Sequence, residues 1–216
     1  MTARDAAPAG HTAAAPTGPP IVLASQSPRR RELLQQLGLA FQVEPARVDE
    51  SLLPGEDAAE HVRRLALEKA RAVAARRPEA LVIAGDTAVV LDDQVMAKPR
   101  DTEDAVAMLL RLQGKTHRVE TGVAVAVPGG RALADVVGAD VTFRAFDEDF
   151  ARAYVATGEP MDKAGAYGIQ GHGAALVEAV AGDYFAVVGL PIARVVVMLE
   201  EGGWRYAFGG GVREIG

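Results

Sequence analysis

The stretch IVLASQSPRRRELLQQLG, residues 21–38, constrains the fold most strongly because it joins a buried strand to a helix. Residues 21–24 are all apolar and predict a buried strand, and three leucines then recur at helical spacing up to Gly38. Ser27 stands where a helix N-cap is expected, and a proline follows it at the first helical position. The stretch therefore predicts a strand–turn–helix unit.

Three arginines follow the proline, although the positive end of the helix dipole disfavours cations. Backbone N–H groups at such a turn attract anions, and two guanidiniums with paired donors suit a polyphosphate. Arg29 and Arg30, with the hydroxyls of Ser25 and Ser27, are therefore candidate phosphate-binding residues. The alternative is an ordinary Ser-Pro helix start with a solvated arginine face. Arg31, about 100° further round the helix, fits that alternative best.

Strand and helix patterns alternate along the rest of the chain, which predicts an α/β fold. The longest helical pattern runs over about 57–77, and the run 81–96 contains two apolar segments broken at 85–87. The segment after 203 carries no clear pattern. The other expected elements are a turn at Asp92 and Asp93, a loop followed by a helix within 98–114 with acids in the first turn of the helix and Gly114 closing it, strands over 116–127 and 132–146, a helix from Asp147 to about Thr157, a glycine-rich loop leading to a strand near 180, and a helix over 189–203.

Composition excludes several functional classes. The net charge of −6 argues against a nucleic-acid-binding surface, and the absence of cysteine excludes disulfides, thiol catalysis and cysteine-based zinc sites. No apolar run approaches the length of about 18 residues that a membrane span needs, so we expect no membrane association and a cytoplasmic location. We expect an Ala/Pro-rich disordered tail over 1–20, a folded domain over 21–205 and a C-terminal tail over 206–216.

Two acidic positions are candidates for chemistry. Asp86 interrupts apolar runs, so its carboxylate would need a metal, a cation or a reacting water as a partner. The alternative is a turn aspartate that binds its own backbone beside Gly85. Glu50 lies in a loop where acids are usually solvated, unless it is a second oxygen ligand of a divalent cation.

Three lysines and one glutamine are weaker candidates when each is considered alone. Lys69 falls in phase with the apolar stripe of its helix, so it either extends to solvent or points into a charged cleft. Lys98 precedes a proline and by itself suggests surface. Lys163 and Gln170 lie in the segment DKAGAYGIQG, whose small residues either allow close approach to a ligand or only form a tight loop.

Taken in order, seven motifs resemble the Maf family over about residues 21–200. Proteins of that family are nucleoside triphosphate pyrophosphatases, related in fold to inosine triphosphate pyrophosphatases, and were also named as inhibitors of septum formation. The resemblance implies an α/β fold with a mixed twisted sheet, flanking helices and a central cleft between two lobes. The motifs are LASQSPRRRELL, DES, LALEKARAV, GDTAVV, KPRDTEDAVAMLLRLQGKTHRVETGVAV, YVATGEPMDKAGAYGIQG and VVGLP.

The resemblance also implies roles for individual residues. The acid of the family's Gly-Ala-Asp-Thr motif is taken as the proton acceptor and corresponds to Asp86, although this chain reverses the first two residues. The family's Gly-Lys-Pro motif here begins with Ala97. A divalent cation, Mg²⁺ or Mn²⁺, would be held by Asp86 and Glu50. The implied substrate-binding residues are Ser25, Ser27, Arg29, Arg30, Lys69, Thr87, Lys98, Lys163 and Gln170.

The resemblance extends to the substrate. Maf proteins of the thymidine and uridine triphosphate group carry Arg, Thr and Gln at three positions linked to specificity, and this chain has Arg29, Thr87 and Gln170 there. The 7-methylguanosine triphosphate group tends to carry Trp, Gln and Glu instead. The resemblance therefore implies hydrolysis of dTTP and UTP, and of modified pyrimidine nucleotides, to monophosphate and pyrophosphate.

Two other functions stay open at this point. One is a regulator of cell division that senses nucleotide and acts by binding a partner, as the family's name suggests. The other is a nucleotidyltransferase that uses the triphosphate as a donor. The expected partner in each case is a nucleoside triphosphate, and a homodimer is an expected assembly because family members often pair.

Overall fold

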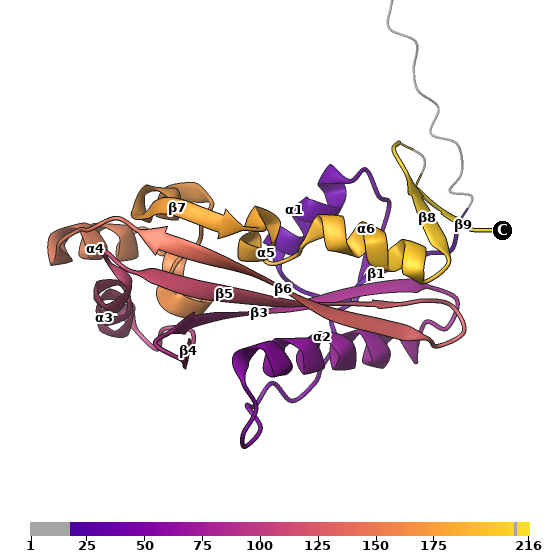
Figure 1. Cartoon of the computed structure of the whole chain (residues 1–216), viewed down its shortest axis with the longest axis horizontal. Helices are drawn as coiled ribbons and strands as arrows, with labels where there is room; N and C mark the ends of the chain where they lie inside the picture. The colour runs from indigo at the N-terminus through magenta and orange to yellow at the C-terminus, as the bar shows by residue number, and fades with distance from the viewer. Residues whose placement is uncertain (1–17, 210) are drawn as a thin grey trace, which may run out of the picture.

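A seven-stranded mixed sheet forms the centre of the molecule (Figure 1). The structure is a computed structural model that describes residues 18–209 and 211–216, so most of the tail expected over 1–20 lies outside the described residues. In sheet order the strands are β2 (Gln42–Val43), β1 (Ile21–Leu23), β3 (Leu81–Leu91), β5 (Thr116–Ala126), β6 (Ala132–Phe143) and β7 (Val177–Gly182), and β4 (Gln94–Met96) pairs with β3.

Helices flank both faces of this sheet, which confirms the predicted fold class. Among residues 18–209 and 211–216, no helix has both the length and the apolar character needed to cross a bilayer. Figure 1 shows α2 (Ala58–Ala74) on one face, α1 (Pro28–Gln36), α5 (Tyr184–Val188) and α6 (Ile192–Glu201) on the other, and α3 (Thr102–Leu112) and α4 (Glu148–Val155) together at one end.

The predicted helix starts are confirmed by their caps. The Ser27 hydroxyl accepts a hydrogen bond from the Arg30 N–H at 3.4 Å, with Pro28 as the first helical residue. Asp57 and Glu60 form a reciprocal capping box at the start of α2, which satisfies two N–H groups that the helix leaves free. At the starts of α3 and α4 the carboxylates of Asp101 and Asp147 each accept a hydrogen bond from the backbone N–H three residues on, without the reciprocal bond.

β3 differs from its prediction because it is one strand of eleven residues rather than two runs broken at 85–87. It pairs with β5 without interruption from Val82 to Val90, so Asp86 lies inside the strand and not in a turn. The predicted turn at Asp92 and Asp93 is confirmed, and both residues adopt positive φ, which a tight hairpin turn requires.

The second edge of β3 is only partly paired. β1 runs parallel to residues 81–83, whereas β4 runs antiparallel to residues 89–91. β1 ends at Leu23, and its chain then leaves the sheet to enter α1. Within the described part of the chain, no strand pairs with residues 84–88 on this edge, which leaves an opening in the middle of the sheet.

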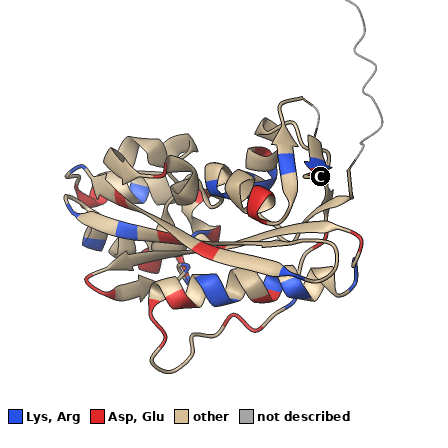
Figure 2. Ribbon diagram, turned by 45° about the vertical axis from the view of Figure 1, so that its right-hand side comes forward, with Lys and Arg blue, Asp and Glu red and all other residues tan. Residues whose placement is uncertain are grey.

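The core is divided between two lobes on either side of that opening. One lobe packs α1, α5 and α6 against one sheet face, while α2 covers the other face over a layer rich in alanine. The second lobe packs α3 and α4 around Phe143, Tyr154 and Tyr167. Figure 2 shows Lys and Arg interspersed with Asp and Glu along α2, so this helix carries no single-sign surface.

Two elements had no counterpart in the sequence prediction. The short helix α5 lies between the predicted strand near 180 and the predicted helix over 189–203, where no element was expected. The C-terminal segment, expected to be a tail over 206–216, contains a hairpin of β8 (Trp204–Ala207) and β9 (Gly211–Glu214). Tyr206 donates a hydrogen bond to the Leu37 carbonyl at 2.6 Å, which ties this hairpin to the end of α1.

Candidate active site

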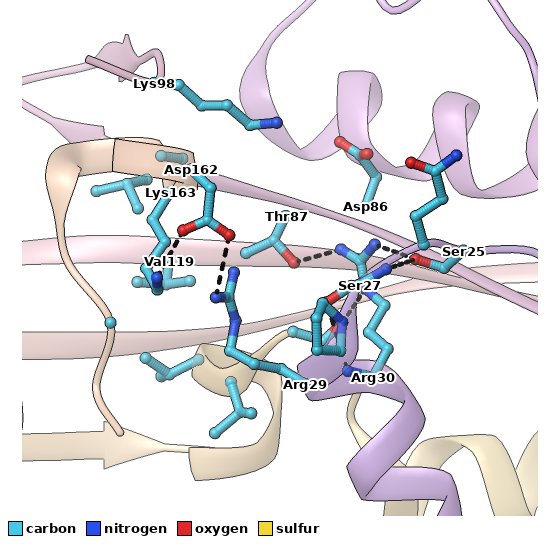
Figure 3. Close-up of a pocket in the computed structure, with 18 of the residues that line it drawn as sticks. Ser25, Ser27, Arg29, Arg30, Asp86, Thr87, Lys98, Val119, Asp162 and Lys163 are labelled. Atoms are coloured by element: carbon cyan, nitrogen blue, oxygen red, sulfur yellow. Dashed lines mark hydrogen bonds and ion pairs between the residues drawn. The ribbon is translucent and has the colours of Figure 1, made fainter. Parts of the chain in front are cut away.

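A cleft of about 610 Å³ opens at the unpaired part of β3, between the two lobes (Figure 3). Its walls come from the turn after β1, from α2, and from the segments 162–169 and 187–189. Nearly all residues that the resemblance implies are found here. The predicted residues that line the cleft are Ser25, Ser27, Arg29, Arg30, Glu50, Lys69, Asp86, Thr87, Lys98 and Lys163.

The alternation of side chains along β3 decides which helix each cleft residue faces. Ala84 packs in the layer beneath α2, so Asp86, two residues further on, projects toward the same helix. Thr87 projects to the opposite face, toward α1 and α5. One strand therefore supplies an acid to one side of the cleft and a hydroxyl to the other.

Lys69 joins the two predicted acids of the cleft. Its Nζ atom lies 2.7 Å from Oδ1 of Asp86 and 2.6 Å from Oε1 of Glu50, and the lysine is only 8% exposed. The Lys69 ammonium holds the pKa of the Glu50 carboxyl below its ordinary value by hydrogen bonding. The position of Lys69 on the apolar stripe thus reflects a buried ionic group and not extension to solvent.

Gly122 allows α2 to lie close enough for this contact. It is the β5 partner of Asp86 in the sheet register, and a β-carbon at this position would overlap the Val62 carbonyl of α2. The absent side chain lets the helix backbone rest directly on the strand. The height of α2 over the sheet, and with it the reach of Lys69, depends on this glycine.

Arg30 is held by uncharged groups rather than by acids. Its Nε donates to the Gly189 carbonyl at 2.7 Å, one Nη to Ser25 Oγ at 3.1 Å and the other to Thr87 Oγ1 at 3.1 Å. Burial lowers the pKa of the guanidinium, which the more distant Asp86 only partly offsets. A guanidinium has five N–H donors, so two remain for a ligand.

Two residues of β3 position that arginine: Thr87 accepts its hydrogen bond, and Gly85 leaves space for its side chain. Thr87 Oγ1 also lies 2.9 Å from Oγ1 of Thr121, whose hydroxyl donates to the Ala186 carbonyl. A β-carbon at Gly85 would stand 3.3 Å from Nε of Arg30, closer than ordinary packing contacts. The reversed Ala-Gly order of this chain therefore leaves the arginine more room than the family order would.

Asp162 is a cleft residue that the sequence reasoning missed. Its Oδ1 atom lies 2.6 Å from Lys163 Nζ, and its Oδ2 atom lies 3.8 Å from an Nη atom of Arg29 (Figure 3). Burial alone would raise the pKa of Asp162, but these two cations hold it below its ordinary value. Its place directly before Lys163 in the motif DKAGAYGIQG was the only signal for it. Gly189, in the quoted motif VVGLP, was likewise given no role.

The remaining predicted residues lie further from this network. Lys98 lines the cleft but is exposed to solvent. Gln170 is not among the residues that line the cleft, and lies just before the 3₁₀ helix η3 (Gly171–Leu176). The three positions linked to specificity are therefore not equivalent in this structure, because Arg29 and Thr87 face the cleft directly.

The acids of the cleft fit a divalent cation in part. No group of three or more His, Cys, Asp or Glu side chains with metal-site geometry occurs among the described residues. Glu50 and Asp86 each bind the same ammonium through one oxygen, which leaves each with a second oxygen. Mg²⁺ commonly uses one or two carboxylates together with substrate phosphates, and this pair matches that pattern.

Comparisons with known proteins agree on one family. The family described as "Maf-like protein" matches residues 20–202. A dTTP/UTP pyrophosphatase of Symbiobacterium thermophilum is 50% identical over 190 residues, covering 88% of this chain and 97% of that protein. One from Moorella thermoacetica is 53% identical over 180 residues, covering 83% of this chain and 93% of that protein.

Similarity to a solved structure is weaker. A nucleoside-triphosphatase / dITP/XTP pyrophosphatase from Mycobacterium abscessus aligns with a TM-score of 0.40 and 13% identity. The alignment covers 83% of this chain and 93% of that one. A likeness at this level is too low to bear on the activity of the chain.

Proposed function

Because the chain belongs to the Maf family, we propose that it hydrolyses dTTP and UTP to the nucleoside monophosphate and pyrophosphate. Such an enzyme is a hydrolase of acid anhydrides with a house-cleaning role in nucleotide metabolism. The observation that carries the proposal is the Glu50–Lys69–Asp86 group, which faces the arginine-bearing start of α1 across the cleft. We assign this activity to the domain over residues 21–205.

Asp86 is the residue that acts on the attacking water. One of its oxygens is bound to Lys69, and the other is available to orient the water and accept its proton. The water oxygen bonds to the α-phosphorus while the bond to the bridging oxygen breaks, and pyrophosphate leaves with that electron pair. The ion pair with Lys69 fixes the carboxylate, so its geometry is set before the substrate arrives.

Cations around the cleft stabilise the triphosphate. The two free N–H groups of Arg30 are donors without an acidic partner in direct contact among the described residues, so phosphate oxygens are suitable acceptors. Ser25 and the backbone at Ser27 add donors at the start of α1, where the helix dipole favours an anion. Lys98 lines the cleft, and its exposed ammonium group can contact and stabilise the negative charge that develops on the leaving pyrophosphate.

In an alternative role for its second oxygen, Asp86 would join Glu50 in holding a divalent cation, Mg²⁺ or Mn²⁺, together with phosphate oxygens. When bound, the ion supplies positive charge that neutralises the phosphates. The contact of both acids with Lys69 keeps them close together without an ion, because the ammonium offsets their mutual repulsion.

Product analysis tests the proposal. Purified protein with Mg²⁺ or Mn²⁺ should convert dTTP and UTP to monophosphate and pyrophosphate ahead of the other nucleoside triphosphates. Asp86→Asn should lower kcat by about a hundredfold or more while nucleotide binding persists, because a general base typically contributes 10²–10⁴-fold. Asp149→Asn, the same change on the exposed surface of α4, is the matched control. Unchanged turnover in Asp86→Asn would remove that residue from the mechanism.

A further inference from the structure

The end of the cleft opposite the acid group has a distinct chemical pattern. In Figure 3, Asp162, Lys163 and Arg29 lie on one side, Asp86 and the guanidinium of Arg30 lie on the other, and Thr87 is between them. The phosphate-directed groups are concentrated around Asp86 and Arg30. The group at Asp162 is therefore placed to meet the other end of a nucleotide, which is its base.

Asp162 is an acceptor with a donor on each side. Oδ1 faces the ammonium of Lys163, and Oδ2 faces the guanidinium of Arg29. A carboxylate has about four lone-pair positions, so Asp162 can still accept further hydrogen bonds. Both neighbouring cations also keep donors beyond those that face Asp162. The three side chains together present a donor–acceptor–donor sequence to the cleft.

Lys163 is held firmly in this arrangement. Its Nζ also donates to the Glu159 carbonyl at the start of the 3₁₀ helix η1 (Glu159–Asp162). A β-carbon at Gly168 would stand 2.9 Å from Cε of Lys163, so the lysine stem crosses this glycine in close contact. The carboxylate of Glu159 in turn accepts bonds from the N–H groups of His172 and Gly173. The donor beside Asp162 is therefore set in place by the surrounding loop.

We propose that Asp162 is a specificity-determining residue that accepts the N3–H of uracil or thymine, with Arg29 and Lys163 donating to the two flanking carbonyl oxygens. This inference rests on the proposed function and names how the same cleft selects its base. Uracil and thymine present an acceptor–donor–acceptor edge, which complements the three side chains. Cytosine presents an amino group and an unprotonated ring nitrogen instead. The carboxylate of Asp162 would then face another acceptor, the ring nitrogen, and one of the two cations would face another donor, the amino group. Sites that hydrogen-bond a substrate group strongly reject analogues that lack it.

The test compares three substrates with two variants. Wild-type protein should favour UTP over both CTP and 3-methyluridine triphosphate, which lacks the N3–H, by at least about tenfold in kcat/KM. Asp162→Asn should reduce the UTP-to-CTP ratio by about tenfold or more, because its amide N–H can donate to the cytosine ring nitrogen. Asp162→Ala should bring UTP and 3-methyluridine triphosphate to similar kcat/KM values. Asp149→Asn should keep both wild-type ratios.

The outcomes separate this inference from the proposed function. If wild-type protein hydrolyses no nucleotide, the proposed function fails. If wild-type protein hydrolyses UTP and the Asp162 variants change kcat/KM by the same factor for all three substrates, Asp162 only balances the two cations and the inference is wrong. Asp162 is exposed, and its ion-pair partners among the described residues, Arg29 and Lys163, do not belong to the core. Both variants should therefore fold, and a thermal unfolding curve checks this.

Discussion

His117 is a buried histidine whose two ring nitrogens have unequal surroundings. Nε2 lies 2.7 Å from the hydroxyl of Tyr167, a residue of the cleft wall, whereas Nδ1 has no hydrogen-bond partner among the residues that the structure describes. The ring is 3% exposed and contacts Phe143 and Tyr167 edge-on. A second proton on this ring would place an N–H where no acceptor is available. Burial accordingly lowers the pKa of His117 from 6.5 to about 4.

This pKa predicts a specific loss of stability in acid. Between pH 6.5 and about 4 the unfolded chain binds a proton at His117 that the folded chain does not, so the free energy of unfolding falls as pH falls through this range. The residue contributes a loss of about 3 kcal/mol in total, and no more below pH 4. Urea unfolding at pH 7 and pH 4 should therefore show a smaller pH effect in His117→Gln than in wild type. Equal pH effects in the two proteins would contradict the assignment.

Residues of the cleft differ in how far the sequence could predict them. Asp86 and Lys69 were detectable because each breaks an apolar pattern, and a buried charge requires a partner. Arg30 was a predicted phosphate-binding residue, but the hydrogen bonds that hold its guanidinium were not predictable. Their acceptors belong to Gly189, Ser25 and Thr87, which are brought together only by the fold. Asp162 was missed because acids and lysines are mostly exposed on protein surfaces, so an acid beside a lysine carries no signal of a site.

At the scale of elements, the contact between α2 and β5 is set by Gly122. Gly122→Ala should lower the free energy of unfolding by about 2 kcal/mol or more, because the helix must move away from the strand to relieve the overlap with Val62. Urea unfolding measures the loss. Gly85→Ala on the neighbouring strand is the comparison, since its β-carbon would stand 3.2 Å from the nearest atom, and we expect a smaller loss. Equal losses in the two variants would contradict the role given to the overlap with Val62.

Elements were predictable where their signals are local. Helix starts at Ser27, Asp57, Asp101 and Asp147 carry capping side chains, and these four boundaries follow from the sequence. β3 was divided in error because Gly85-Asp86-Thr87 resembles a turn. Its continuity is imposed by the unbroken pairing with β5, in which the paired residues lie 28 to 44 positions apart along the chain. α5 is only five residues long and gives almost no periodic signal.

At the scale of the whole molecule, the C-terminal hairpin closes one end of a lobe. Trp204, Tyr206 and Val212 pack on the core shared by α1 and α6. Tyr206→Phe removes the hydrogen bond to Leu37 and should lower the free energy of unfolding by about 1 kcal/mol without changing kcat, because the hairpin does not line the cleft. Arg213→Ala, a change at an exposed side chain of β9, is the control and should affect neither quantity. A loss of activity in Tyr206→Phe would show that the hairpin influences the cleft.

The continuity of β3, β5 and β6 has a mechanical consequence. These strands of eleven and twelve residues run beneath both lobes, so the floor of the cleft is one continuous, rigid part of the sheet. Bringing the lobes together would require bending these three strands and breaking hydrogen bonds between them. We therefore expect the groove to keep a nearly constant width when a nucleotide enters or leaves. Exchange rates should then follow the strength of individual contacts, and a poorly fitting base should be rejected before any large movement of the protein.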